Sequence, residues 1–308
     1  MHIRAATRGS ALARWQAERL SALIVAARPG TTVDIVVVET TGDLDQTTPL
    51  EQMGGQGVFV KEVQIAVLEG RADVAVHSAK DLPALTPDAL VLAAVPERAD
   101  PRDALVGCRF DDLPAGATVA TGSIRRRAQL AHRRPDLEFT GLRGNIGTRL
   151  AKLDGPEGFA AIVVAAAALD RLGLAPAVVD RLDQSVLLPQ VGQGALAVEC
   201  RADDAGVVEL LASVDDPTVH RTVAAERAFL AELGAGCDLP VAAHAVLVDG
   251  SILGGGPDGA LRLTGSVSSS DGTVLLTDER TGSDGLGMGR AVARFLLDER
   301  GGSALLSR

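Results

Sequence analysis

Aromatic residues and cysteines are scarce in this sequence. Of the 308 residues only 2% are aromatic, with no tyrosine and a single tryptophan. The cores must therefore be built from Ala, Val, Leu and Ile, and there is little material for stacking on nucleobases. Three cysteines, Cys108, Cys200 and Cys237, are an odd and small number that gives no disulfide framework. We expect reduced thiols and a cytoplasmic protein.

Long apolar runs and targeting segments are also missing. The first residues, MHIRAATRGS, contain no apolar core of a secretory signal. The longest apolar run, residues 159–169, is too short to span a bilayer and predicts a buried strand that leads into a helix. We therefore expect no association with a membrane. With 46% hydrophobic and 23% charged residues, the composition is typical of a globular protein, and the length allows two or three domains.

Lysine is rare, and positive charge is unevenly distributed. Lys61, Lys80 and Lys152 are the only lysines, and 40 acidic residues against 30 basic ones give a net charge of −10. Residues 121–152 nevertheless hold eight arginines or lysines and only two acidic residues. Such a segment in an acidic chain favours a site for a small polyanion. Nucleic acid is the alternative anion, but the few aromatics, the pI of about 5.0 and the absence of a nucleic-acid-binding motif disfavour it.

Strand and helix patterns alternate along most of the chain. Strands are expected at 2–7, 32–40 and 72–78, with helices from 11 and over 58–70, which predicts an α/β sheet. Residues 95–104, with two prolines and five charges, predict a crossing into a second α/β unit. A helix after Asp216, three short alternating strands and a helix near 285–299 then predict a small α+β domain.

The arginines cluster at two expected helix starts. If a helix begins near Ser123, Arg125 and Arg126 occupy its first turn, where the backbone N–H groups also favour anions. Arg143 and Arg149 flank a second expected start. Forked guanidinium groups at two such ends suit several carboxylates or phosphates. The alternative is a solvated helix face, which remains open for any single arginine.

Two further stretches carry possible chemistry. In ADVAVHSAKDLP a strand ends in Ser78, Lys80 and Asp81, at the sheet edge where α/β proteins bind ligands. An ionised Asp81 could stabilise a positive charge on a substrate, or could equally be a turn cap before Pro83. In LGAGCDLPV, Cys237 lies in a glycine-flanked loop where a thiol can react. The histidines and cysteines show no metal-ligand spacing, so no metal is expected.

Taken together, these stretches resemble the porphobilinogen deaminase family. The resemblance covers nearly the whole chain. It rests on a series of motifs in the family's order: ATRGSALARWQAE, GVFVKE, VAVHSAKDLP, RADPRDALV, TGSIRRRAQL, LRGNIGTRLAKLD, LPQVGQGALAVECR and GAGCDLPV. It implies two domains like those of periplasmic binding proteins around a cleft, plus a small α+β domain. The implied boundaries are 1–96 with 194–214, 97–193, and 215–308.

The resemblance also implies a cofactor and a set of site residues. Cys237 matches the cysteine that carries a dipyrromethane cofactor through a thioether, and Asp81 matches the catalytic aspartate. Further cofactor contacts match Ser78, Lys80, Thr121, Ser123, Arg125, Arg126, Arg143, Gly144 and Gln193. Substrate-binding positions match Arg8, Ser10, Gln16, Phe59, Arg149 and Arg171. Gln52 and Gln56 stand where the family usually has lysines, which puts loop contacts to the cofactor in doubt.

The implied reaction joins four porphobilinogen molecules head to tail, with loss of ammonia, and releases a linear tetrapyrrole by hydrolysis. A growing chain of dicarboxylate rings would explain the need for so many permanent cations. The protein would act as a monomer on this small molecule. The alternative is a non-catalytic two-domain binder of a small carboxylate, which would need neither Cys237 nor Asp81.

Overall fold

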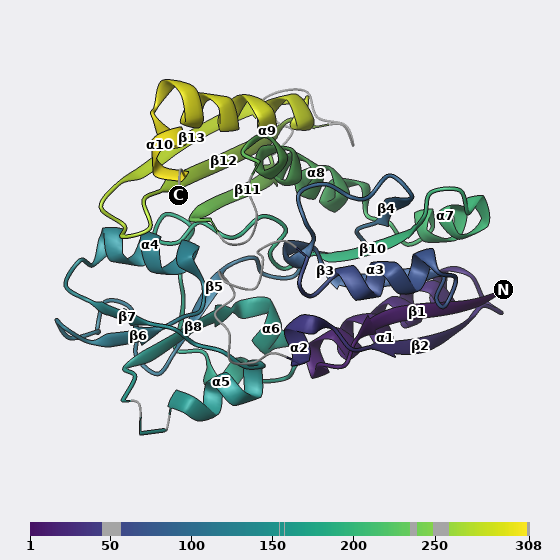
Figure 1. The fold of residues 1–308 in the computed structure, drawn as a ribbon, viewed down its shortest axis with the longest axis horizontal. Coiled ribbons are helices and arrows are strands. Elements are labelled where there is room, and N and C mark those ends of the chain that lie inside the picture. The colour runs from purple at the N-terminus through teal and green to yellow at the C-terminus, as the bar shows by residue number, and fades with distance from the viewer. Residues whose placement is uncertain (45–56, 154, 157, 235–238, 249–258, 307–308) are drawn as a thin grey trace.

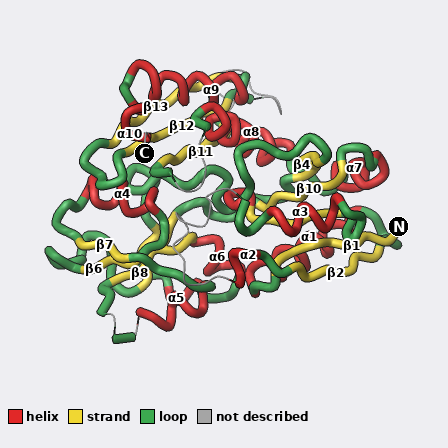
Figure 2. The backbone as a smooth tube through the Cα atoms, viewed as in Figure 1, coloured by secondary structure: helices red, strands yellow, loops and turns green. Residues whose placement is uncertain are grey.

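The computed structural model describes residues 1–44, 57–153, 155–156, 158–234, 239–248 and 259–306. Within these ranges the chain forms three sheets, each accompanied by helices (Figures 1 and 2). Two sheets have five strands and belong to α/β units, and the third has three strands and belongs to a small α+β unit. The predicted fold class is thereby confirmed. No helix among the described residues is long and apolar enough to cross a membrane.

The first sheet has the strand order β2-β1-β3-β10-β4. Strand β1 (His2–Arg8) pairs in parallel with β2 (Thr32–Val38) and β3 (Val74–Ser78). Strand β10 (Leu196–Arg201) lies antiparallel between β3 and β4 (Leu90–Ala94), so a late segment of the chain completes the N-terminal sheet. The helices of this unit are α1 (Ala11–Ala27), α2 (Thr41–Leu44), α3 (Lys61–Leu68) and α7 (Ala205–Ala212).

The second sheet has the order β7-β6-β8-β5-β9. Its strands are β5 (Asp103–Val106), β6 (Thr118–Ala120), β7 (Glu138–Thr140), β8 (Ala161–Ala165) and β9 (Asp180–Arg181). The accompanying helices are α4 (Ile124–Arg133), α5 (Ile146–Leu153) and α6 (Ala166–Arg171), with a short 3-10 turn, η3 (Ala175–Ala177). The apolar run at 159–169 forms β8 and leads directly into α6, as predicted.

The third sheet is antiparallel, in the order β11 (Val241–Leu247), β12 (Leu261–Ser268) and β13 (Leu275–Gly282). Helices α8 (Pro217–Glu232) and α9 (Gly285–Arg294) pack together against it, followed by a π-helical turn, η4 (Phe295–Glu299), and α10 (Gly302–Leu306). The Asp216 side chain caps α8 by accepting from the N–H of Thr218 and Val219, as the Asp-Pro start predicts.

The cores are aliphatic, as the composition requires. Among the largest fully buried side chains of the described residues, Phe229 is the one aromatic, and the others are leucine and isoleucine. Each sheet has its own apolar cluster: Phe229 packs with Val267 and Val292 in the third unit, apart from the clusters around β1 and β8. We retain the division into three domains at the predicted boundaries as a proposal.

Glu226 on helix α8 forms hydrogen bonds that connect the third unit with the segments between the two α/β units. This fully buried carboxylate accepts hydrogen bonds from Arg98 Nη1 at 2.7 Å, from the N–H of Gly192 at 2.7 Å and from the N–H of Ala245 at 2.8 Å. Arg98 and Gly192 belong to the two segments that cross between the α/β units, and Ala245 to β11. Burial opposes ionisation, but the charge of Arg98 and the His244 contact lower the pKa of Glu226 to about 2.

Candidate active site

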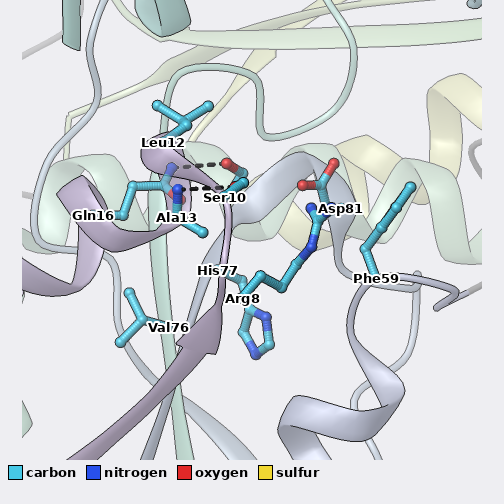
Figure 3. Close-up of a pocket in the computed structure, with 10 residues that line it drawn as sticks. Arg8, Ser10, Leu12, Ala13, Gln16, Phe59, Val76, His77 and Asp81 are labelled. Atoms are coloured by element: carbon cyan, nitrogen blue, oxygen red, sulfur yellow. Dashed lines mark hydrogen bonds between the residues drawn. The ribbon is translucent and has the colours of Figure 1, made fainter. Parts of the chain in front are cut away.

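The first pocket forms where β1 and β3 end. Because the two strands are parallel neighbours, their carboxyl ends meet at one edge of the sheet, and Arg8 and Ser78 at these ends both line the pocket. A 3-10 turn, η2 (Ala79–Asp81), follows β3 and presents Asp81. The pocket is lined by Arg8, Ser10, Leu12, Ala13, Gln16, Phe59, Val76, His77, Ser78 and Asp81, and encloses about 340 Å³ that is open to solvent. It is shown in Figure 3.

The polar side chains of this pocket are held in place by local contacts. The Ser10 hydroxyl caps α1 by accepting from the N–H of Ala13 at 3.3 Å, and buried Gln16 donates Nε2 to the Ser78 hydroxyl at 2.7 Å. The Arg8 guanidinium lies over the Phe59 ring, 4.1 Å from its centroid. Figure 3 shows Arg8 extending toward the Asp81 carboxylate, with Phe59 beside it. The pocket thus combines a cation, an aromatic face and a carboxylate.

A second pocket adjoins the first through η2, because Lys80 lines it while the next residue, Asp81, lines the other. Its wall comes from all three units: Lys80, Leu82, Ser123, Arg125, Gln190, Val191, Leu230, Leu239 and Val241. Lys80 Nζ lies 3.4 Å from Gln193 Oε1. Burial, with repulsion from Arg126, lowers the pKa of Lys80 to about 8, against the opposing effect of Asp81.

Arg125 and Arg126 are held by a buried carboxylate that sequence reasoning missed. Arg125 Nη2 and Arg126 Nη2 each lie 2.7 Å from an oxygen of Asp103, which is fully buried at the start of β5. Burial opposes ionisation of Asp103, but the two guanidiniums hold its pKa below the usual range. Arg125 and Arg126 also donate to the carbonyls of Leu188 and Val163. The alternative of a solvated helix face is therefore wrong for both arginines, which are almost completely buried.

One carboxylate shared by two guanidiniums leaves a net positive charge at this place. Gln193 Nε2 also donates to Asp103, at 3.0 Å, and so belongs to the same cluster. Arg125 Nε is buried and has no hydrogen-bond partner among the described residues. Thr121 and Ser123 accept hydrogen bonds from the N–H of Ser123 and Arg126, and each hydroxyl still has its hydrogen to donate. These groups suit an anionic ligand in the second pocket.

Arg149 joins this positive region. Its Nε donates to the carbonyl of Gly144 at 2.8 Å, across the first turn of α5. Burial, followed by repulsion from Arg126 and Arg143, lowers the pKa of Arg149 to about 10, while Asp81 acts in the opposite direction. Arg126, Arg143 and Asp81 are thus all close enough to Arg149 to interact with it electrostatically. Within the described part of the chain no carboxylate lies within 4 Å of the Arg149 guanidinium.

Arg171 is not brought together with the other predicted residues. It lies at the end of α6, where Nη2 donates to the carbonyl of Gly194 at 2.9 Å and the guanidinium lies 5.2 Å from the Trp15 ring centroid. Glu97 is 3.8 Å away. Arg171 lines neither of the two pockets and connects α1 with the segments that cross between the α/β units.

Residues 3–209 match the family model described as "Porphobilinogen deaminase, dipyromethane cofactor binding domain", and residues 220–298 match "Porphobilinogen deaminase, C-terminal domain". The chain belongs to the porphobilinogen deaminase family. It is therefore a transferase of porphyrin and haem biosynthesis with a dipyrromethane cofactor and porphobilinogen as its substrate class.

Several solved structures are weakly similar. The VFT2 domain of BvgS from Bordetella pertussis is 17% identical over 69% of this chain and 86% of that one, with a TM-score of 0.41. The methionine-binding protein MetQ is 14% identical over 73% and 94%, with a TM-score of 0.43. A nutrient binding protein from Burkholderia cenocepacia bound to methionine is 15% identical over 70% and 93%, with a TM-score of 0.42.

The residues present in the second pocket fit a dipyrromethane. Such a group carries carboxylates, and the pocket offers the ammonium of Lys80, the unsatisfied Nε of buried Arg125 and the Ser123 hydroxyl. Burial and, after it, repulsion from neighbouring cations lower the pKa of Lys80 and of Arg149, and a bound polyanion would relieve that repulsion. The apolar side chains of Leu230, Leu239 and Val241 can cover ring faces. The charge and the apolar lining of the pocket both suit the family's cofactor.

The predicted attachment residue, Cys237, lies outside the described residues, as do Gln52 and Gln56. Leu239, two positions after Cys237 in the sequence, lines the second pocket. The other two cysteines have different surroundings. Cys108 is half-buried, while Cys200 is buried in β10, and this burial raises the pKa of its thiol to about 11.

Beneath the first pocket lies a second charged cluster that the sequence did not indicate. His77 lines the pocket, and its Nε2 lies 3.3 Å from the fully buried carboxylate of Glu199 on β10. Gln64 on α3 donates to the same carboxylate at 2.8 Å. Burial opposes ionisation of Glu199, but the proximity of His77 and the hydrogen bond from Gln64 keep its pKa below the usual range. A sequence feature that could have indicated this cluster is Glu199, an acidic residue within the apolar strand LAVECR.

Proposed function

We propose that this protein is a hydroxymethylbilane synthase, which joins four porphobilinogen molecules head to tail and releases the linear tetrapyrrole by hydrolysis. The observation that carries the proposal is the Lys80–Asp81 turn, whose two side chains line adjoining pockets. One pocket can receive the incoming ring and the other can hold the rings already present. The product would enter haem and porphyrin biosynthesis.

The first pocket is proposed to bind porphobilinogen. Each porphobilinogen carries two carboxylates and an aminomethyl group, so Arg8 and the Ser10 hydroxyl would bind carboxylate oxygens while Phe59 covers the ring. Gln16, Arg149 and Arg171 complete the proposed substrate contacts. Arg8 lies over the Phe59 ring, and Arg149 couples electrostatically to Asp81, which supports placing both near the reacting ring. For Arg171 the proposal requires movement from its present contacts.

Asp81 is proposed as the acid–base residue. When the carbon–nitrogen bond of porphobilinogen breaks, ammonia leaves and the substrate ring becomes cationic. An ionised carboxylate beside that ring stabilises the developing charge. Asp81 can then accept the proton released when the new carbon–carbon bond forms and pass it to ammonia, which departs as ammonium.

The second pocket is proposed to hold the cofactor. The proposed cofactor contacts are Lys80, Ser78, Thr121, Ser123, Arg125, Arg126, Arg143, Gly144 and Gln193. The proposed point of attachment, through a thioether, is Cys237. When bound, the dipyrromethane supplies the pyrrole carbon to which the first substrate ring is joined. The protein's own contribution is to neutralise carboxylates by guanidinium and ammonium groups and to exclude water by Leu230, Leu239 and Val241.

The Asp81→Asn variant tests this proposal. We expect it to fold and to carry the cofactor, but to lose about 100-fold or more in kcat because the acid–base and electrostatic roles both need a carboxylate. Turnover is followed by the appearance of hydroxymethylbilane from porphobilinogen. The exposed Asp88, seven residues further on, gives a matched control, and Asp88→Asn should equal the unmodified enzyme. An Asp81→Asn enzyme with normal kcat would refute the assignment.

A further inference from the structure

Gly42 lies against the aromatic residue of the first pocket. A Cβ placed on Gly42 would be 2.2 Å from Cε1, 2.5 Å from Cδ1 and 2.9 Å from Cζ of Phe59, far inside van der Waals contact. The backbone of Gly42 also donates its N–H to the carbonyl of Val58 at 3.3 Å. Its φ angle is not positive, so an alanine would meet no backbone strain there. Space for the Phe59 ring is thus the constraint that excludes a side chain at position 42.

The Phe59 ring has a second neighbour, the Arg8 guanidinium, which lies over its face at 4.1 Å. Gly42 meets one edge of the ring, formed by Cδ1, Cε1 and Cζ. A ring pushed away from position 42 would therefore carry its face away from Arg8. The position of Arg8 depends on where the ring lies, and Figure 3 shows that Arg8 extends from the ring toward Asp81.

The segment that carries Gly42 is itself fixed to α3. The N–H and the hydroxyl of Thr41 donate to Glu62 Oε1 at 3.1 Å and 2.6 Å. Burial opposes ionisation of Glu62, but these two hydrogen bonds hold its pKa below the usual range. Glu62 stands in the first turn of α3, three residues after Phe59. Gly42 cannot retreat easily from an added methyl group, so the ring has to move.

We propose that Gly42 is a positioning residue for the reaction with porphobilinogen: the absence of a side chain lets Phe59 lie where its face supports Arg8 beside Asp81. The proposal rests on the proposed function of the first pocket as the substrate site. Gly42 acts through Phe59 and touches no substrate. Its loss should therefore weaken substrate binding more than it slows the chemical step.

A double-mutant cycle tests the proposal through steady-state kinetics. We expect Gly42→Ala to raise KM for porphobilinogen about tenfold through the disturbed Arg8–Phe59 contact, with a smaller change in kcat. In the Phe59→Ala background the added methyl has no ring to displace, so the double variant should match Phe59→Ala within about twofold. Gly206→Ala is the control, because its Cβ would meet only Asp204 Oδ1, at 3.8 Å. If the two substitutions instead act independently, so that the change in KM of the double variant is the product of the two single changes, the proposal is overturned.

A spectroscopic readout separates this proposal from the proposed function. In protein labelled with fluorophenylalanine, the ¹⁹F resonance of Phe59, assigned by its absence in Phe59→Leu, should shift in Gly42→Ala and stay in place in Gly206→Ala. An unmoved resonance overturns the positioning role whether or not porphobilinogen is consumed. Absence of turnover in the unmodified enzyme would overturn the proposed function alone. If Gly42→Ala fails to fold, the proposal requires that removal of the ring in the double variant Gly42→Ala/Phe59→Ala restores folding. A double variant that also fails to fold would contradict the proposal.

Discussion

At the scale of single residues, the site depends on carboxylates that form ion pairs with buried arginines. Asp103 neutralises part of the charge on Arg125 and Arg126, and all three side chains are buried. Two cations on one anion leave the cluster short of negative charge. The ion pairs hold the arginine side chains in position, and the remaining positive charge still attracts ligand carboxylates.

Substitution of Asp103 by asparagine should be strongly destabilising. It leaves two buried guanidiniums without their anion, and breaking a buried ion pair costs roughly 3–5 kcal/mol. The free energy of unfolding in urea measures this cost. The matched control is Asp112→Asn, which removes an exposed partner of Arg109 at 3.8 Å and should change stability by less than about 1 kcal/mol. A near-neutral Asp103→Asn would contradict the account of this cluster.

Glu226 predicts a pH dependence of stability. The pKa of its carboxyl falls from an ordinary value of 4.5 to about 2 in the folded protein. Because the folded pKa is depressed, the contribution is fully present above pH 4.5 and is lost as the pH falls toward 2. Unfolding free energies of the parent and Glu226→Gln should therefore differ most near neutral pH and converge as the pH is lowered from 6 to about 3. A gap that stays constant over this range would count against the assignment.

These residue pairs could not be predicted from the sequence for a physical reason. The local signals were sufficient for helix caps, and Ser10, Ser123 and Asp216 all cap helices where the pattern placed them. Arg98 and Glu226, however, are 128 positions apart in the chain. No local pattern records which acidic residue meets which buried arginine. The sequence indicated the cations of the site, and the structure was needed to find their carboxylates.

At the scale of elements, hydrophobic periodicity predicted strands and helices such as β1, β3 and α8, but it missed β4 and α7 and did not predict how the elements pack. Strand β10 is one example: the family resemblance assigned residues 194–214 to the first domain, but no local pattern indicates that β10 lies antiparallel between β3 and β4. The turn between β12 and β13 is another. It packs on α4, where the carbonyl of Gly272 lies 2.9 Å from His132 Nδ1, and so connects the third unit with the helix that carries Arg125 and Arg126.

The Gly272→Ala variant should weaken this contact between elements. Gly272 has φ +79°, and a Cβ there would lie 2.4 Å from the carbonyl oxygen of Ala128. Gly301 is a matched control, because its φ of +78° is nearly the same and a Cβ would meet nothing within 4 Å. Gly301→Ala should therefore cost about 1 kcal/mol of unfolding free energy from backbone strain alone. Gly272→Ala should cost clearly more, and equal costs would contradict the packing described.

At the scale of the whole molecule, an acidic chain surrounds a cationic interior site. The net charge is −10, yet Lys80, Arg125, Arg126, Arg143 and Arg149 come together where the three units meet. The charge pattern located these cations in residues 121–152, but only the family resemblance linked them to Lys80 and Asp81, because that proximity arises from the packing of the units. A single site served by all three units suits a ligand that grows while it remains attached to the protein.

The most direct test of the account is the intact mass of the freshly purified protein, before and after addition of porphobilinogen. We predict a mass that exceeds the polypeptide by one dipyrromethane, further increments of one pyrrole ring each after porphobilinogen is added, and the bare polypeptide mass for Cys237→Ser. An unmodified polypeptide that nevertheless converts porphobilinogen to hydroxymethylbilane would contradict it.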